Sequence, residues 1–197
     1  SDGPLVSYAA SGSSGNTVVV YVNSSGALDF WINETKSTST AMDYRTLANG
    51  QLQALSVTWD SSGGAWQVYL NGSLLDSGTG LATGQSIVGG GALLFGQEQD
   101  AVQGGFDPAQ SLHATLYNAR IFNDVRTAAE IQSGAHATLS TNTSGLLANW
   151  RFNDLSTAGV VTEAVSGNNL TLNHAYGSGF TSGNPTLTLT IDENIAN

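Results

Sequence analysis

Short runs of alternating apolar and polar residues, separated by polar turns, recur along most of the chain. Residues 16–33 contain two such runs around a turn from Asn23 to Gly26. Residues 54–70 repeat this plan, and an Asn71-Gly72 pair follows the second run. An Asn-Gly pair between alternating runs is the strongest short hairpin signal, because both residues accept positive φ. The pattern therefore predicts antiparallel strands joined by tight hairpins.

The second half of the chain continues the pattern and interrupts it once. Between strand-like runs, Thr127 and Glu130 have the spacing of a capping box, and Gly134 is a stop signal, so a short helix is expected. We predict an all-β fold of two antiparallel sheets packed face to face, with one short helix. The further strand-like segments are 91–96, 113–123, 145–154 and 168–175.

The C-terminal segment differs in composition from the rest. Residues 177–184 are rich in Gly, Ser and Asn, and residues 186–190 alternate Thr and Leu without a partner hairpin. The final stretch TIDENIAN resembles the first strand of the cadherin-like repeats of large bacterial surface adhesins. We therefore expect a ligand-binding domain over residues 1–176. Residues 177–197 are predicted to be a linker and the start of a following cadherin-like repeat.

Composition excludes several classes of partner. Only 10% of the residues are charged, and 15 acidic residues against five Lys and Arg give a net charge of −10. A nucleic-acid-binding protein needs a basic surface, and an anionic membrane would repel this chain. No apolar run approaches the roughly 20 residues of a membrane span. Cysteine is absent, so disulfides and thiolate metal sites are excluded.

This charge-poor chain nevertheless places acidic residues close together in one short stretch. Glu98 and Asp100 follow the apolar run ALLF, and Asp107 returns after two glycines. Like charges at this spacing repel one another unless a cation lies between them. Calcium prefers roughly six to eight oxygen ligands, which carboxylates, the Gln99 carbonyl and the Gln110 amide can supply. From the residues alone, a calcium site and a solvated loop both remain open.

Two segments make the chain recognisable. LSVTWDSSGGAWQVYLNGSLLDSGTGL and GALLFGQEQDAVQGGFDPAQSLHATLYNARIFNDVRTAAEIQ resemble the pentraxin family of laminin-G-like, concanavalin A-like sandwiches. The resemblance covers roughly residues 5–135. It implies a jelly-roll β-sandwich whose acidic loop holds two calcium ions, with the outer ion open to a ligand.

The resemblance also implies a role for each residue of the loop. Glu98 and Asp100 would bridge both ions, and the Gln99 carbonyl would join the first ion. Asp107 and Gln110 would hold the second ion. The implied metal ligands also include the amide of Asn16, which lies near the start of a strand.

Near that strand the chain departs from the family, which has an Asp-Asn pair there. Gly15 stands in place of the Asp, so the first calcium site loses a charge. Strand alternation directs Val20 into the core and Tyr21 onto the open face that carries the loop, where the family has an aromatic residue beside the ligand. All four tryptophans, including Trp31, are expected in the core. The implied ligand-binding residues are Tyr21, Glu98, Asp107 and Gln110.

A second cation is implied by another resemblance. Residues 145–173 are similar to a stretch of laminin-G-like bacterial domains in which Asp and Asn oxygens hold a structural ion. Asp154, Glu163 and Asn168 are the candidate ligands. The alternative is a plain edge strand followed by an Asn-rich turn.

Enzyme activity is not expected. One hydrolase family with this type of sandwich uses Glu-x-Asp-x-x-Glu, but starting from Glu98 the last position holds Gln103, which cannot act as the acid. We predict instead a calcium-dependent carbohydrate-binding (lectin) module of a secreted bacterial surface adhesin. It would be monomeric within a longer chain and bind a cell-surface glycan, such as a fucosylated one. The alternatives are binding of a peptide carboxylate or a phosphate headgroup, or a spacer role in which calcium only stiffens the loop.

Overall fold

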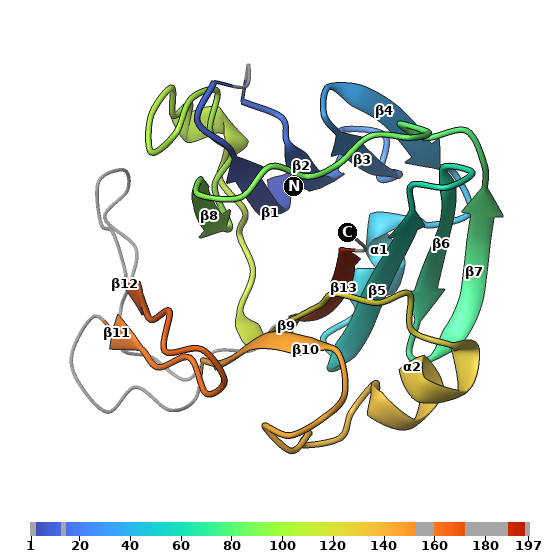
Figure 1. Cartoon of the computed structure of the whole chain (residues 1–197). Coiled ribbons are helices and arrows are strands. Elements are labelled where there is room, and N and C mark those ends of the chain that lie inside the picture. Colours follow the sequence, from blue (N-terminus) through green and yellow to red (C-terminus); the bar gives the residue numbers. More distant parts are fainter. Residues whose placement is uncertain (1–2, 13–14, 153–159, 172–188, 196–197) are drawn as a thin grey trace.

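Two β-sheets face each other across the core in the computed structural model, which describes residues 3–12, 15–152, 160–171 and 189–195 (Figure 1). The first sheet has five strands in the order β4-β3-β2-β1-β8, and all neighbours in it are antiparallel. These strands are β1 (Gly3–Ala9), β2 (Val18–Val22), β3 (Leu28–Ile32), β4 (Thr35–Ser39) and β8 (Ala92–Phe95).

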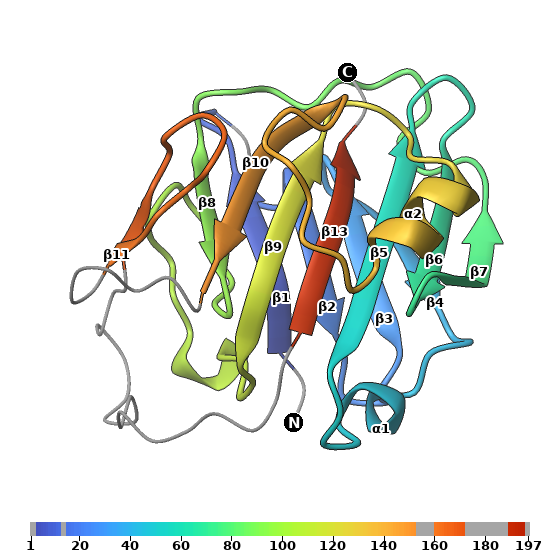
Figure 2. The ribbon, with the colours of Figure 1, turned by 90° about the horizontal axis from the view of Figure 1, so that it is seen from below.

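The second sheet has six strands in the order β10-β9-β13-β5-β6-β7, and Figure 2 shows it in front of the first sheet. Two very short strands form a separate pair. The strands of the second sheet are β5 (Gln53–Asp60), β6 (Ala65–Leu70), β7 (Ser73–Gly78), β9 (Leu116–Phe122), β10 (Leu146–Arg151) and β13 (Leu189–Ile195). The separate pair consists of β11 (Val160–Val161) and β12 (Leu170–Thr171).

Helices are few and short. They are α1 (Tyr44–Leu47), α2 (Ala128–Gly134) and the 3-10 turn η1 (Pro108–Gln110). The α2 helix packs closely against the turn after β6, because a Cβ on Gly72 would lie 2.7 Å from the Cα of Gln132. No helix in the described part of the chain is both long enough and apolar enough to cross a bilayer.

The predicted hairpins and helix are confirmed, and with them the all-β antiparallel sandwich. Asn71 and Gly72 have φ of 50° and 80°, the left-handed pair that a tight hairpin requires. In α2, Thr127 and Glu130 form the complete capping box. Strand β4 was not predicted, because its residues, TKSTS, are all polar and it lies at the edge of its sheet. Helix α1, a single helical turn, was not predicted either.

The core lies between the two sheets and follows the predicted alternation. Val18, Val20 and Val22 of β2 all belong to it. Phe30 meets Trp66 of the opposite sheet edge-on, with ring centroids 4.8 Å apart. At the other end, Phe95 packs against the Trp150 ring at 5.5 Å. The buried apolar side chains thus form two clusters, and the partly buried Leu93 and Phe95 pack against both of them.

The position of β13 differs from what the sequence predicts. Residues 189–195 pair in parallel with β5 on one side and with β9 on the other, whereas the sequence analysis assigned them to a following repeat. The Thr and Leu alternation indicated a strand, but pairing between distant segments is not encoded in a local pattern. The domain division at residue 177 stays a prediction, and the second sheet includes a strand from beyond it.

Candidate metal centre

The loop that follows β8 doubles back on itself, as its glycines predicted. Ala101 and Gly104 exchange two backbone hydrogen bonds, with N···O distances of 3.2 and 2.9 Å. Gly105 has a φ of 71°, and a Cβ there would lie 2.7 Å from the Cβ of Asp100. A glycine is therefore required for the returning chain to pass so close to Asp100.

Gln99 fastens this loop to the first sheet. Its side chain is fully buried, and its Nε2 donates to the carbonyl oxygens of Ser7 (3.1 Å) and Ala92 (2.8 Å). Its Oε1 accepts a hydrogen bond from the Gln103 N–H at 2.9 Å. Because both ends of the side chain are engaged, the backbone carbonyl is the part of Gln99 that remains for a cation. That carbonyl is the atom the sequence analysis assigned to the first ion.

Glu98 lies beside this anchor and is only 4% exposed. Neither of its carboxylate oxygens has a hydrogen-bond partner among the described residues. The Gln99 N–H beside it donates to the Ser7 Oγ at 3.3 Å instead. Burial, followed by the nearby Asp100 carboxylate and more weakly by that of Glu34, raises the pKa of Glu98 to about 7, while the adjacent Gln99 N–H partly opposes the rise. A buried carboxylate without donors is costly, and a cation is the partner that would compensate the cost.

Asn16 approaches the loop from the first sheet. Its backbone N–H and its Nδ2 both donate to the Glu34 carboxylate, at 2.8 and 2.9 Å. The preceding residue, Gly15, touches the loop directly, because a Cβ there would lie 2.8 Å from the carbonyl carbon and oxygen of Asp100. Since the amide nitrogen of Asn16 is held by Glu34, its Oδ1 is the side-chain atom left for a cation.

Asp107 and Gln110, the predicted ligands of the second ion, lie on the returning arm of the loop. The Asp107 carboxylate accepts a hydrogen bond from the Ala109 N–H at 2.9 Å and caps η1. The Gln97 Nε2 donates to the Asp107 carbonyl at 3.0 Å, which links the outgoing arm of the loop to its returning arm. Among the described residues, no three acidic or histidine side chains converge closely enough to hold an ion. The structure thus places the predicted carboxylates in one compact loop without bringing the full ligand set together.

A row of side chains lies beside this loop on the outer face of the first sheet. The strand register aligns Ser7, Val19, Trp31 and Lys36 across β1, β2, β3 and β4. Ser7 lies on β1 and contacts Gln99 of the loop. Trp31 lies on β3, two strands away from Ser7, which is a distance of about 10 Å. The Tyr21 ring meets the Trp31 ring edge-on at 6.4 Å, and the Lys36 Nζ lies 5.1 Å from the Trp31 ring centroid.

The structure confirms the outward direction of Tyr21 and corrects the placement of Trp31. Tyr21 is half-buried on the outer face, while its β2 neighbours Val20 and Val22 enter the core. Trp31 was expected in the core but is also half-buried on this outer face. Since Phe30 and the residue after Trp31 point inward, the two-residue period of a strand directs Trp31 outward. The other three tryptophans are buried, as predicted.

The second predicted metal site has a different geometry. Glu163 is buried, but its carboxylate accepts hydrogen bonds from the backbone N–H groups of Asn149 (2.7 Å), Val165 (2.7 Å), Ser166 and Gly167 (2.8 Å). The Ser166 Oγ donates to it as well, at 2.7 Å. Burial by itself raises the pKa of Glu163, but these hydrogen bonds outweigh burial and the pKa lies below its ordinary value.

These donors explain the burial of Glu163 without a cation. The backbone oxygen of Asn168 accepts a hydrogen bond from the Trp150 Nε1 at 2.8 Å. Asp154, the third candidate, lies outside the described residues. The described geometry therefore favours the hydrogen-bonded turn, and a metal ion at this place stays a prediction.

Restoring the acid that the family has at residue 15 is expected to damage the protein. Gly15 has a φ of 115°, and a side chain there would collide with the Asp100 backbone. Gly15→Asp should cost at least about 1–3 kcal/mol of unfolding free energy from backbone strain alone. Urea unfolding measures this cost, with Gly12→Asp as the control, because Gly12 is also left-handed but has open space around it. A G15D variant as stable as G12D would contradict the close packing.

Two residues of this site were missed from the sequence, Glu34 and the outward Trp31. A signal for Glu34 existed, because the Asn33-Glu34 pair joins two strands where a tight hairpin favours Asn-Gly. A charged residue in a position that favours glycine indicates a role beyond the turn. For Trp31 the signal was the strand alternation, which directs this residue outward. The prediction instead placed Trp31 in the core because tryptophans in strands are commonly buried.

Comparison with known proteins agrees with this architecture. The sequence profile of the Pentaxin family matches residues 3–164. The protein "Sushi, von Willebrand factor type A, EGF and pentraxin domain-containing protein 1" of Rattus norvegicus is 35% identical over 131 residues, which are 66% of this chain and 4% of that protein. Neuronal pentraxin-2 of Homo sapiens is 34% identical over 113 residues, which are 57% of this chain and 26% of that protein.

This chain therefore matches only a small part of the length of these relatives. A solved structure, the native heptameric SAP-like pentraxin from Limulus polyphemus, is 22% identical with a TM-score of 0.48, and the match covers 72% of this chain and 64% of that one. Because the family profile spans most of the sequence, the chain belongs to the pentraxin family, a family of calcium-dependent ligand-binding domains.

Proposed function

We propose that this chain is a calcium-dependent carbohydrate-binding module in which Ca²⁺ at the loop after β8 holds the sugar directly. The observation that carries the proposal is the Glu98 carboxylate, which is buried and has no hydrogen-bond partner among the described residues. A bound calcium ion would neutralise the crowded carboxylates and leave coordination positions for sugar hydroxyls. The proposed ligands are Asn16, Glu98, the Gln99 carbonyl and Asp100 for the first ion, with Asp107 and Gln110 for a second.

The aromatic pair on the outer face supports a sugar as the ligand. Tyr21 and Trp31 are half-buried on the outer face, and Trp31 lies about 10 Å from the loop anchor, close enough for the pair to contact the apolar face of a bound pyranose. Lys36, the cation nearest to this pair, forms an ion pair with Asp29 at 2.8 Å. Because its charge is already compensated, the face favours a neutral ligand over a phosphate headgroup.

Trp31→Ala separates sugar contact from metal binding. We expect it to weaken binding of L-fucose, a sugar with vicinal cis hydroxyls, by about tenfold, because the ring loses its stacking partner. The calcium affinity should not change, since Trp31 is not a ligand of the ion. Calorimetry with L-fucose in the presence of calcium measures the sugar affinity, and calorimetry with Ca²⁺ alone measures the calcium affinity.

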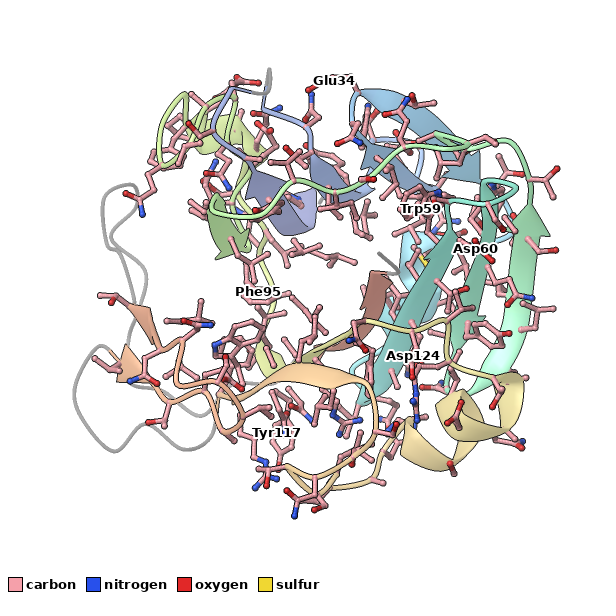
Figure 3. All side chains as sticks on the ribbon, in the orientation of Figure 1. Glu34, Trp59, Asp60, Phe95, Tyr117 and Asp124 are labelled. Carbon is pink, nitrogen blue, oxygen red and sulfur yellow. The ribbon has the colours of Figure 1, made fainter. Side chains whose placement is uncertain are left out.

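The matched control is Tyr117→Ala, which removes an exposed aromatic ring from β9 of the second sheet (Figure 3). Equal loss of sugar binding in both variants would show that the outer face of the first sheet is not the binding surface.

A glycan array, probed in calcium and again in chelator, tests the proposed function itself. Glycan binding only in the presence of calcium supports it. If no glycan is retained, binding of a peptide with a free C-terminus would favour a peptide carboxylate as the ligand, and binding of phosphocholine vesicles would favour a phosphate headgroup. Calcium binding with no retained ligand of any kind would favour the spacer role.

A catalytic role is not part of this proposal. The position that a retaining hydrolase needs for its acid holds Gln103, which is exposed at the tip of the loop. Its amide side chain donates hydrogen bonds but has no acidic proton to transfer at neutral pH.

We place this module in a secreted adhesin on a bacterial surface, as a monomeric domain of a longer chain that binds a cell-surface glycan. The adhesin is proposed from the sequence resemblance of residues 190–197 to cadherin-like repeats, although residues 189–195 pair with β5 and β9 in this sandwich and the relatives named above are animal proteins. Antibody labelling of intact source cells tests the location, and light scattering tests the oligomeric state.

A further inference from the structure

Glu34 occupies a backbone position that favours glycine. It lies at the tip of the hairpin between β3 and β4, on the side of the first sheet that faces away from the second (Figure 3). Asn33 and Glu34 have φ of 44° and 66°, so both residues are left-handed. A residue with a Cβ is disfavoured in this conformation, and natural hairpins of this length place Gly second. The local fold alone does not account for a Glu here.

The Glu34 side chain is held against the segment that reaches the acidic loop. Its two carboxylate oxygens accept hydrogen bonds from the Asn16 N–H and from the Asn16 Nδ2. Its own backbone N–H donates to the Asn16 carbonyl at 3.0 Å. The residue before Asn16, Gly15, packs against the Asp100 backbone. Glu34 is thus connected to the loop through a short chain of direct contacts.

The same contacts explain why the missing charge cannot be supplied from residue 15. At a φ of 115°, with the Asp100 carbonyl 2.8 Å from any added Cβ, that position accepts no side chain. Glu34 places a carboxylate beside Asn16 from the neighbouring hairpin.

We infer that Glu34 is the positioning residue of the first calcium site and replaces the acidic residue that Gly15 cannot provide. It holds the Asn16 amide by its nitrogen, which leaves the Oδ1 for the ion, and it adds a negative charge next to that ligand. This inference rests on the proposed calcium function. The buried Glu98 carboxylate, without a partner among the described residues, is the independent sign that a cation belongs here.

Calcium titration by calorimetry tests this role with Glu34→Gln, Asn16→Ala and the double variant. Loss of an outer partner of a metal ligand typically lowers metal affinity roughly 10- to 100-fold, so Glu34→Gln should weaken one calcium step by that factor. Because Glu34 acts through Asn16, the double variant should lose little more than Asn16→Ala alone. Glu130→Gln is the control, because it removes one negative charge from α2, where Gln also completes a capping box.

The results separate this inference from the function on which it rests. Unchanged calcium affinity in Glu34→Gln, together with loss of binding in Glu98→Gln, would overturn the role of Glu34 and leave the calcium site standing. No calcium binding by the unaltered protein would overturn both. Strictly additive losses in the double variant would show that Glu34 does not act through Asn16. Melting in chelator verifies that each variant is folded before its affinity is compared.

Discussion

Glu98→Gln is expected to abolish calcium binding and, in the same protein, to stabilise the calcium-free fold at neutral pH. The carboxylate is buried without a hydrogen-bond donor among the described residues, so its charge disfavours folding when no cation is present. Removal of a direct ligand should lower calcium affinity by more than about 100-fold, beyond the typical effect of an outer partner. Calorimetry measures the affinity, and urea unfolding in chelator measures the stability.

The pH dependence of the calcium-free protein gives the sign of this effect. The pKa of Glu98 is raised from 4.5 to about 7, so the neutral form is the one that the fold favours. Below pH 4.5 the group is protonated in both states and contributes nothing. As pH rises from about 4.5 to about 7 the carboxyl ionises in the unfolded state while the folded state still holds its proton, so stability is lost. The loss is at most about 3 kcal/mol, since solvent screens the part due to exposed Asp100.

Glu98→Gln should remove this pH-dependent loss, while Glu130→Gln, with the same change of charge on α2, should keep it. Calcium should raise the melting temperature of the unaltered protein by mass action and leave that of Glu98→Gln unchanged. If the Glu98→Gln protein were less stable than the unaltered protein in chelator at pH 7.5, the conclusion that the Glu98 charge is uncompensated in the fold would be wrong.

Glu163→Ala is expected to be the most destabilising of the substitutions considered. Four backbone N–H groups and the Ser166 hydroxyl donate to this one carboxylate. Alanine leaves these donors without an acceptor, at a cost of about 3–5 kcal/mol. Glu163→Gln keeps an acceptor oxygen and should cost less. Urea unfolding followed by tryptophan fluorescence, to which Trp150 contributes beside this turn through its Nε1 hydrogen bond to Asn168, measures both variants.

The pKa of Glu163 is lowered in the fold, so its stabilisation is present above its unfolded pKa of about 4.5 and is lost as pH falls through the folded value. This direction is opposite to that of Glu98. The cost of Glu163→Ala should be the same in calcium and in chelator, because the donors belong to the protein. A cost that appears only in calcium would instead support the metal ion predicted for this turn.

Much of the fold followed from local sequence. The hairpins around Asn23 and Asn71 and the capping box of α2 depend on residues within a few positions of one another, and all of them are present. The acidic loop was also predicted, because Gly104 and Gly105 close it locally. The position of β13 was not, since its partners β5 and β9 lie far away in the sequence.

Local sequence specifies the strands, their turns and the loop that carries Glu98 and Asp100, because these depend on backbone preferences and alternation over short distances. Which buried carboxylate has hydrogen-bond donors depends instead on the tertiary structure. Glu98 and Glu163 look alike in the sequence, yet folding surrounds Glu163 with backbone N–H groups and leaves Glu98 beside other carboxylates. The physical reason is that the free energy of a buried charge depends on which groups surround it, and distant parts of the chain supply those groups.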